Sequence, residues 1–116
     1  MIREDGDLFE AVAFDRPVVN PDGHGGTETA WSGDADAVKA RANFRFLRGG
    51  EAVQAARLSG RQPLVATVRR SLATRQVTTD WRMRDTRTGV EYQIRSIVHT
   101  DDRLFLEMTV ESGGAV

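Results

Sequence analysis

WRMRDTRTGVEYQIRSI, residues 81–97, alternates apolar and polar side chains along two runs that are separated by the tetrapeptide TRTG. A period of two is typical of β-strands, whose successive side chains point to opposite faces. A four-residue turn at TRTG would pair Trp81 with Ile94 and Met83 with Tyr92, so that these apolar side chains share one face. The stretch therefore predicts an antiparallel hairpin with one apolar and one charged face.

The following segment predicts a third strand beside this hairpin. A three-residue loop at 100–102 would place Tyr92 opposite Val110 and Ile94 opposite Met108. In the same register Ile97 and Phe105 oppose each other on the charged face. Because large apolar side chains grouped among charges mark contacts, we expect this pair to be covered by another chain or by a helix, and we assign it to an inter-subunit interface.

Charged side chains on that face fall opposite one another and predict a structural charge ladder. One rung consists of Asp80, Arg95 and Glu107, and a second consists of Arg84 and Glu91. Exposed cross-strand pairs contribute only about 0.2 to 1 kcal/mol each. We therefore expect the ladder mainly to select the register and to discourage edge-to-edge aggregation.

Period-two alternation predicts three more strands nearer the N-terminus. They fall at residues 7–16, at residues 27–48 with an interruption near 32–36, and at residues 63–70. The first stops at Pro17, which cannot donate a ladder hydrogen bond, and it therefore suits an edge strand. NPDGHGG, residues 20–26, predicts a turn, in which glycines supply positive φ angles and Asp22 caps its own backbone.

Only the run GGEAVQAARLSG shows a helical period, and glycines stand at both of its ends. A helix this short is not stable alone, so it must dock on the domain or fold on a partner. Six strands and one long excursion at about 47–62 predict a mainly β fold, a small six-stranded antiparallel β-barrel or sandwich with one short helix in a long loop. We expect a single domain over 1–116, with flexible ends at about 1–6 and 112–116.

Composition restricts the function. The chain has 116 residues, of which 40% are hydrophobic, and it contains no cysteine and two histidines. Disulfides and thiolate metal sites are thus excluded, and we expect neither a metal nor a cofactor. No apolar run approaches the roughly 20 residues that span a bilayer, and the N-terminus lacks a signal peptide's pattern, so we expect no membrane contact and synthesis in the cytoplasm.

Charge is distributed unevenly along the chain. Residues 1–36 carry nine acids against two arginines, whereas residues 37–103 carry fourteen bases against six acids. Such a division favours a molecule with an acidic and a basic side, suited to head-to-tail contacts between copies, although the two sets of charges could also intermix in space.

Catalysis is not expected, because no nucleophile stands beside a plausible base. Ser59, Ser71 and Ser96 have no motif around them, His24 lies in the glycine-rich turn, and His99 precedes another turn. We therefore expect that the protein is not an enzyme.

Nucleic-acid binding has a better basis in the sequence. FRFLR, residues 44–48, interleaves aromatic residues with arginine, as single-strand-binding barrels do. By alternation, however, Phe44 and Phe46 share the face of Ala40 and Ala42 and belong to the core. A freestanding single-stranded nucleic-acid-binding β-barrel remains the alternative function.

The order of short motifs resembles that of a known family. The motifs are DGHGG at 22–26, the following Trp31, LRGGE at 47–51, TVR at 67–69 and YQI at 92–94. In this order and spacing, roughly residues 6–111 resemble the head-tail joining family of tailed phages, also called head closure or stopper proteins, which have counterparts in gene transfer agents. The chain departs from the family pattern at SGDAD, residues 32–36, where the family continues directly into its strand.

The resemblance implies a virion protein made in the bacterial cytoplasm. Its β-barrel would assemble as a sixfold or twelvefold ring between the portal and its adaptor protein above and the tail terminator below, retain packaged double-stranded DNA and dock the tail. On the family pattern the 47–62 excursion faces the channel and acts as a gate. Its Arg48, Arg57 and Arg61 would contact DNA phosphates without base specificity, or else pair with acids of the neighbouring subunit.

Overall fold

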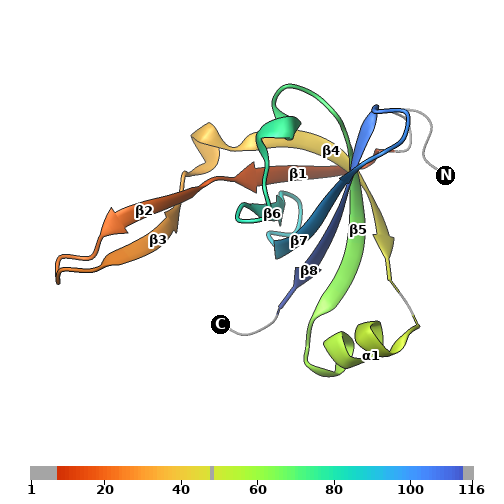
Figure 1. Ribbon diagram of the computed structural model, residues 1–116, viewed down its shortest axis with the longest axis horizontal. Coiled ribbons are helices and arrows are strands. Elements are labelled where there is room, and N and C mark those ends of the chain that lie inside the picture. The colour runs from red at the N-terminus through yellow and green to blue at the C-terminus, as the bar shows by residue number, and fades with distance from the viewer. Residues whose placement is uncertain (1–7, 48, 114–116) are drawn as a thin grey trace.

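The computed structural model describes residues 8–47 and 49–113, which form a closed β-barrel with two excursions from it (Figure 1). In chain order the elements are β1 (Glu10–Asp15), β2 (Pro17–Pro21), β3 (Thr27–Trp31), a 3-10 turn (Asp34–Asp36), β4 (Val38–Phe46), α1 (Glu51–Leu58), β5 (Gln62–Arg69), a 3-10 turn (Thr74–Gln76), β6 (Arg82–Asp85), β7 (Glu91–His99) and β8 (Phe105–Ser112).

The barrel contains six antiparallel strands in the order β1-β4-β5-β8-β7-β6 and closes by pairing β6 with β1. The predicted six-stranded antiparallel barrel is therefore confirmed. The expectation that the first strand lies at an edge is wrong, because β1 pairs with β4 on one side and with β6 on the other. β1 ends at Asp15, so the missing N–H of Pro17 falls outside the barrel ladder.

Inward-facing side chains from all six strands fill the barrel. They form one cluster with Val77, and the strand members are Val12, Phe14, Ala42, Leu64, Ala66, Val68, Met83, Tyr92, Ile94, Leu106, Met108 and Val110. These residues recur mostly at every second position, which is why period-two alternation located the core. Phe46, expected in the core, is 50% exposed because it stands at the end of β4.

The β6–β7 hairpin has the predicted register. Met83 lies opposite Tyr92, and the N–H of Asp85 donates to the carbonyl of Val90 at 2.9 Å, which closes the TRTG turn. The Asp85 carboxylate also accepts the backbone N–H of Arg87 at 2.9 Å. The turn is thus fixed by its own residues, and its length was readable from the sequence.

The β7–β8 register differs from the prediction. Ile94 lies opposite Val110 rather than Met108, and an irregularity at Arg95 then brings Ile97 opposite Met108. The connecting loop is also longer, because the N–H of Thr100 donates to the carbonyl of Phe105 at 3.0 Å. A β-bulge places an extra residue in one strand, so Ile94 and Ile97, three positions apart, both turn toward the core.

The predicted helix is present as α1, which leaves the barrel between β4 and β5 (Figure 1). Its C-terminal end has the glycine that the sequence indicated: Gly60 takes a φ of 80°, and the N–H of Arg61 donates to the carbonyl of Ala56 at 2.9 Å. Among the described side chains of the helix, Val53 is half-buried and Ala56 is buried, whereas the largest apolar residue, Leu58, stays in solvent.

The second excursion is a hairpin of β2 and β3 that projects from the barrel along the longest axis of the molecule (Figure 1). The principal dimensions are 50 × 36 × 26 Å. The predicted turn lies at its tip, where Asp22 Oδ1 accepts the N–H of His24 at 2.7 Å and that of Gly26 at 3.1 Å. The 3-10 turn Asp34–Asp36 occupies the predicted interruption and leads into β4.

Candidate functional site

The projecting hairpin is a two-stranded sheet with no third strand among the described residues. Its register pairs Pro17 with Trp31 and Pro21 with Thr27. A hairpin alone is at best marginally stable in water, because it has no opposing layer to cover an apolar face. The hairpin is therefore the part of the described chain whose fold most requires support from elsewhere.

One face of the hairpin is apolar. Cross-strand pairing puts Pro17, Val19 and Pro21 on the same side as Trp31, and Val19 is 64% exposed. Between residues 17 and 31 the chain has two acids, Asp22 and Glu28, and no lysine or arginine. The hairpin thus leaves an apolar face uncovered, while of its two acids Glu28 lies on the opposite face, across from Asn20, and Asp22 lies in the turn at the tip.

A buried charge network anchors the root of the hairpin. Asp15, the last residue of β1, is 1% exposed, and its Oδ2 accepts hydrogen bonds from Arg82 Nε at 2.8 Å and Arg84 Nε at 3.2 Å. Burial raises the pKa of Asp15, but the hydrogen bonds from Arg84 and Arg82 outweigh it and hold that pKa below its ordinary value. The carboxylate therefore remains charged inside the barrel wall.

The same two arginines extend from Asp15 to the segment that follows the hairpin. Arg84 Nη2 donates to Asp34 Oδ1 at 2.9 Å, and this hydrogen bond is the main reason that the pKa of Asp34 is lowered. The Arg82 guanidinium lies 4.8 Å from the centre of the Trp31 ring, at the end of β3, and Arg82 also pairs with Glu91 at 2.9 Å. Stacking on Trp31 and pairing with Asp34 fix the direction in which the hairpin leaves the barrel.

The charge ladder predicted from the sequence is only partly present. Arg84 and Glu91 lie opposite each other as expected, yet Glu91 pairs with Arg82, and Arg84 pairs with the two aspartates. The network residues that the sequence reasoning missed are Asp15, Asp34 and Arg82. Arg-x-Arg on one strand was a signal for an acid nearby, but it did not identify Asp15, 67 residues away from Arg82.

The other predicted rung, which consisted of Asp80, Arg95 and Glu107, is wrong. Arg95 Nε donates to Glu111 Oε1 at 2.7 Å instead of pairing with Glu107. The bulge at Arg95 and the longer loop shift β8, so that Glu107 lies opposite Val98. Asp80 precedes β6 and accepts a hydrogen bond from the hydroxyl of Thr78.

The predicted exposed pair Ile97 and Phe105 does not exist. Phe105 is 3% exposed and is covered on one side by the guanidinium of Arg69, which lies 5.8 Å from its ring centre. Ile97 is partly buried against the core, opposite Met108. The register shift separates the two side chains, so they form no shared apolar patch.

The three arginines proposed to face a channel have different surroundings. Arg48 lies outside the described residues. Arg61 Nη1 pairs with Glu111 at 3.4 Å in the same chain. Arg57 is exposed on α1 and lines a shallow cleft with Phe46, Leu47 and Gln62. Of the two described arginines, Arg61 thus pairs with an acid of its own barrel, and Arg57 is exposed on the helix.

A second surface feature opens at the other end of β1. A cleft of about 320 Å³ is lined by Phe9, Glu10, Ala42, Asn43, Phe44, Phe46, Asp85, Arg87, Thr88, Val90 and Tyr92. Phe9 is 71% exposed and Phe46 50% exposed at its rim, while Phe44 packs edge-on against Tyr92 inside it, with 6.0 Å between ring centres. The cleft is therefore aromatic and open, and Phe44 is held by the core as alternation predicted.

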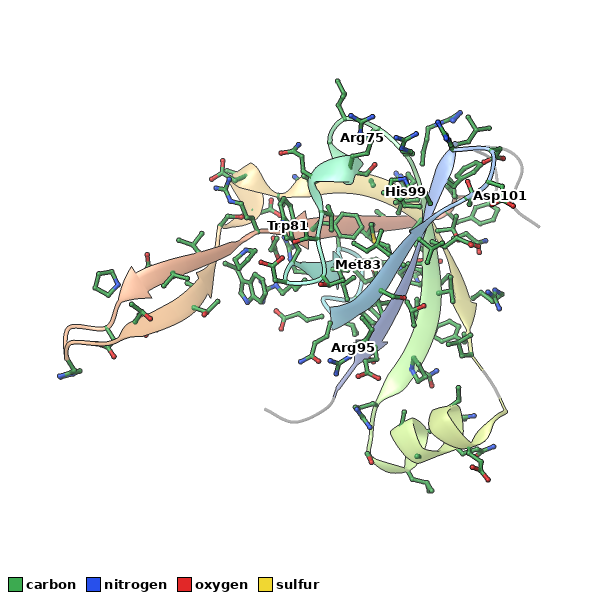
Figure 2. The ribbon with its side chains drawn as sticks, viewed as in Figure 1. Arg75, Trp81, Met83, Arg95, His99 and Asp101 are labelled. Carbon is green, nitrogen blue, oxygen red and sulfur yellow. The ribbon has the colours of Figure 1, made fainter. Side chains whose placement is uncertain are left out.

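The described residues give no sign of an assembled catalytic or metal site. No group of three or more histidine, aspartate or glutamate side chains that could hold a metal ion occurs in residues 8–47 and 49–113. Within the same ranges no helix is long and apolar enough to cross a membrane. Figure 2 shows His99 and Asp101 toward one end of the barrel and Arg95 away from both of them.

Comparison with known proteins gives one family match and one similar solved structure. The sequence pattern of the family described as "Phage head completion protein" matches residues 4–113. Among solved structures, a chain described as "Virion of native gene transfer agent (GTA) particle" shares the fold with a TM-score of 0.63 and 19% sequence identity, covering 93% of this chain and 97% of that one. The comparison with curated proteins finds no match.

Proposed function

This chain belongs to the phage head completion protein family, and we propose that it is a structural connector of a tailed phage or gene transfer agent. In this role, copies of the chain form a ring between the portal-adaptor assembly above and the tail terminator below. The ring retains the packaged double-stranded DNA and provides the surface on which the tail docks. The role is architectural and requires no catalytic group.

The family match over residues 4–113 is the observation that carries this proposal. The uncovered apolar face of the β2–β3 hairpin supports it, because exposed apolar surfaces of this kind mark contacts with other chains. The shared fold with a chain of a gene transfer agent particle agrees with a place in such particles.

We further propose that Arg57 faces the channel and contacts DNA phosphates without base specificity. Its side chain stands on α1 outside the barrel, beside the exposed Phe46. Arg61 contributes less to DNA contact, because Glu111 already compensates its charge. Electrostatic contact with phosphates suits a protein that must hold packaged DNA of any base sequence.

The direct test is to produce particles that lack this chain and to complement them with the wild-type chain. We expect particles without it to lose tails, seen by electron microscopy, and to lose nuclease-protected DNA, while complementation restores both. Cryo-electron microscopy of complemented particles should show a ring of this chain at the head-tail vertex. Tailed, DNA-filled particles formed in its absence would contradict the proposal.

A further inference from the structure

We propose that Glu111 and Gly113, at the C-terminal end of β8, form a clasp that holds the α1 excursion, residues 49–61, against the barrel. When the clasp opens, α1 leaves the barrel wall while the six strands stay paired. The clasp is a property of the single chain, and only its consequence for DNA retention rests on the proposed function. Figure 1 shows that β8 ends on the side of the barrel from which α1 extends.

The helix by itself contributes little to its own placement. α1 has eight residues, fewer than a helix needs to be stable alone. Gly50 is its N-cap, and no side chain among the described residues caps its first turn. Only Val53 and Ala56 of its described side chains are removed from solvent to any large extent, and Leu58 is 88% exposed. Contacts beyond the helix must therefore contribute to its position.

A nearly buried carboxylate makes the first of these contacts. Glu111 is 9% exposed, and its Oε1 accepts hydrogen bonds from Arg95 Nε at 2.7 Å and from Arg61 Nη1 at 3.4 Å. Arg95 lies at the bulge of β7, and Figure 2 shows it near the end of β8. Arg61 ends the α1 excursion, and its N–H donates to the carbonyl of Ala56 within the helix. Glu111 thus joins the end of α1 to β7 and β8 through charge-assisted hydrogen bonds.

A close approach of two backbones makes the second contact. Gly113 has a φ of 74°, and a Cβ atom at this position would overlap the carbonyl oxygen of Gly60, the glycine that follows α1. Only a residue without a side chain allows the two segments to lie this close. The neighbouring residues Ser112 and Gln62 are paired across β8 and β5, which fixes the register of the contact.

The strands on both sides of the excursion are paired without help from the clasp. The N–H of Leu47 donates to the carbonyl of Pro63 at 3.2 Å, and Phe46 lies opposite Leu64. The β4–β5 ladder therefore closes the base of the excursion. Because local opening is confined to segments that few contacts hold, α1 can separate from the wall while the barrel remains folded.

The clasp also determines where the exposed arginine of the helix stands. Arg57 lies in the last turn of α1, and Arg61, which Glu111 holds, follows soon after that turn. Under the proposed function, Glu111 is then a positioning residue for the contact between Arg57 and DNA phosphates.

Amide hydrogen exchange of the isolated full chain, followed by mass spectrometry, tests the clasp. Arg61→Gln removes one ion pair and leaves Glu111 with Arg95, whereas Glu111→Gln removes the charge that both guanidiniums face. We expect both variants to raise the exchange rate of the α1 amides severalfold, with the larger rise in Glu111→Gln, and to leave β1, β4 and β6 unchanged. Glu107→Gln is the matched control, because Glu107 is exposed on the same strand opposite Val98, and it should leave α1 unchanged.

A pair of glycine substitutions gives an independent readout. Gly113→Ala places a methyl group against the Gly60 carbonyl and should raise the exchange rate of α1. Gly89→Ala, in the TRTG turn, is the matched control. Gly89 has a φ of 80° and open space at its Cβ position, so this variant carries a similar backbone strain without the overlap and should leave α1 unchanged.

The outcomes separate the clasp from the proposed function. If α1 exchanges no faster in Arg61→Gln, Glu111→Gln and Gly113→Ala than in their controls, the clasp is wrong. If α1 and the barrel strands speed up together, these residues stabilise the whole barrel, and the clasp is wrong as well. Particles that carry Glu111→Gln are then assayed for nuclease-protected DNA. Loss of DNA supports a clasp that positions α1 for retention, whereas retained DNA with fast α1 exchange leaves the clasp standing and contradicts the proposed contact of Arg57 with DNA.

Discussion

The barrel and the β2–β3 hairpin differ in how completely the chain itself pairs their strands and covers their side chains. In the barrel every strand has two neighbours, and the buried carboxylate of Asp15 is matched by two guanidiniums of the same chain. In the hairpin each strand has one neighbour, and the Val19 side chain stays in solvent. The barrel thus satisfies its own residues, whereas the hairpin leaves an apolar side chain exposed, which suits the contact with another chain that we propose.

The largest difference should appear when apolar residues are truncated in each region. Phe14→Ala opens a cavity in the fully buried core and should lower the free energy of unfolding by about 3 to 5 kcal/mol. Val19→Ala on the hairpin should change it by no more than about 0.5 kcal/mol, since the side chain is already solvated. Urea titration of the isolated chain measures both.

One outcome of these titrations would contradict the comparison between barrel and hairpin. If Val19→Ala destabilised the isolated chain as much as Phe14→Ala does, the hairpin would be part of the cooperative core. The distinction between a self-sufficient barrel and a hairpin that depends on partners would then be wrong.

The next largest effect should come from the network that joins the two regions. Asp15→Ala leaves Arg82 and Arg84 without their shared acceptor, and we expect a loss of about 1 to 3 kcal/mol in the free energy of unfolding. Lys39→Ala is the control, because its ion pair with Asp34 is exposed and should contribute no more than about 1 kcal/mol. If urea titration gave equal losses for Asp15→Ala and Lys39→Ala, the buried network would contribute no more to the free energy of unfolding than the exposed ion pair does.

Lowering the pH should remove the part of the folding stability that depends on the charge of Asp15. The pKa of Asp15 is lower in the folded chain than its ordinary value of 3.8, so folding favours the charged form. The resulting stability is present above that ordinary value and is lost as the pH falls through the folded-state pKa. Urea midpoints measured across this range should fall more steeply for the wild type than for Asp15→Ala, and parallel curves would contradict the assignment.

The smallest effect on stability should come from Arg57→Glu on the second excursion. The side chain is exposed, so the free energy of unfolding should change by no more than about 0.5 kcal/mol. Under the proposed function the variant should nevertheless release DNA from assembled particles, measured as a loss of nuclease-protected DNA. Arg75→Glu, exposed on the connection between β5 and β6, is the charge-matched control and should retain DNA.

Most of the fold was predictable because an antiparallel strand with one buried face shows its structure in every second residue. The TRTG turn, the glycine after α1 and the core positions of β5 all follow from local rules of backbone and pattern. The β7–β8 register was not predictable from the same rules. A bulge at Arg95 changes the phase of alternation in the middle of β7, and no residue there signals it in advance.

The candidate surfaces were less predictable than the fold. Ile97 and Phe105 were expected on one exposed face, but the bulge turns Ile97 inward and Arg69 covers Phe105. The glycine-rich turn and the strand after it were recognised, yet the strand before it, β2, was not, because β2 begins and ends with proline. Prolines lower the strand propensity that a sequence shows, although an isolated two-stranded sheet tolerates them at its edges.

Local pattern was sufficient for the kind of protein: alternating side chains predict a small antiparallel β-barrel or sandwich, and the motif order resembles the family to which the chain belongs. The charge network at Asp15 and the position of the hairpin depend instead on closure of the barrel. It brings β6 against β1 and so joins Asp15 to Arg82 and Arg84, and it leaves the hairpin outside with an apolar face and no third strand among the described residues. These contacts depend on which strands meet in space, and residues far apart in the chain carry no local signal of meeting.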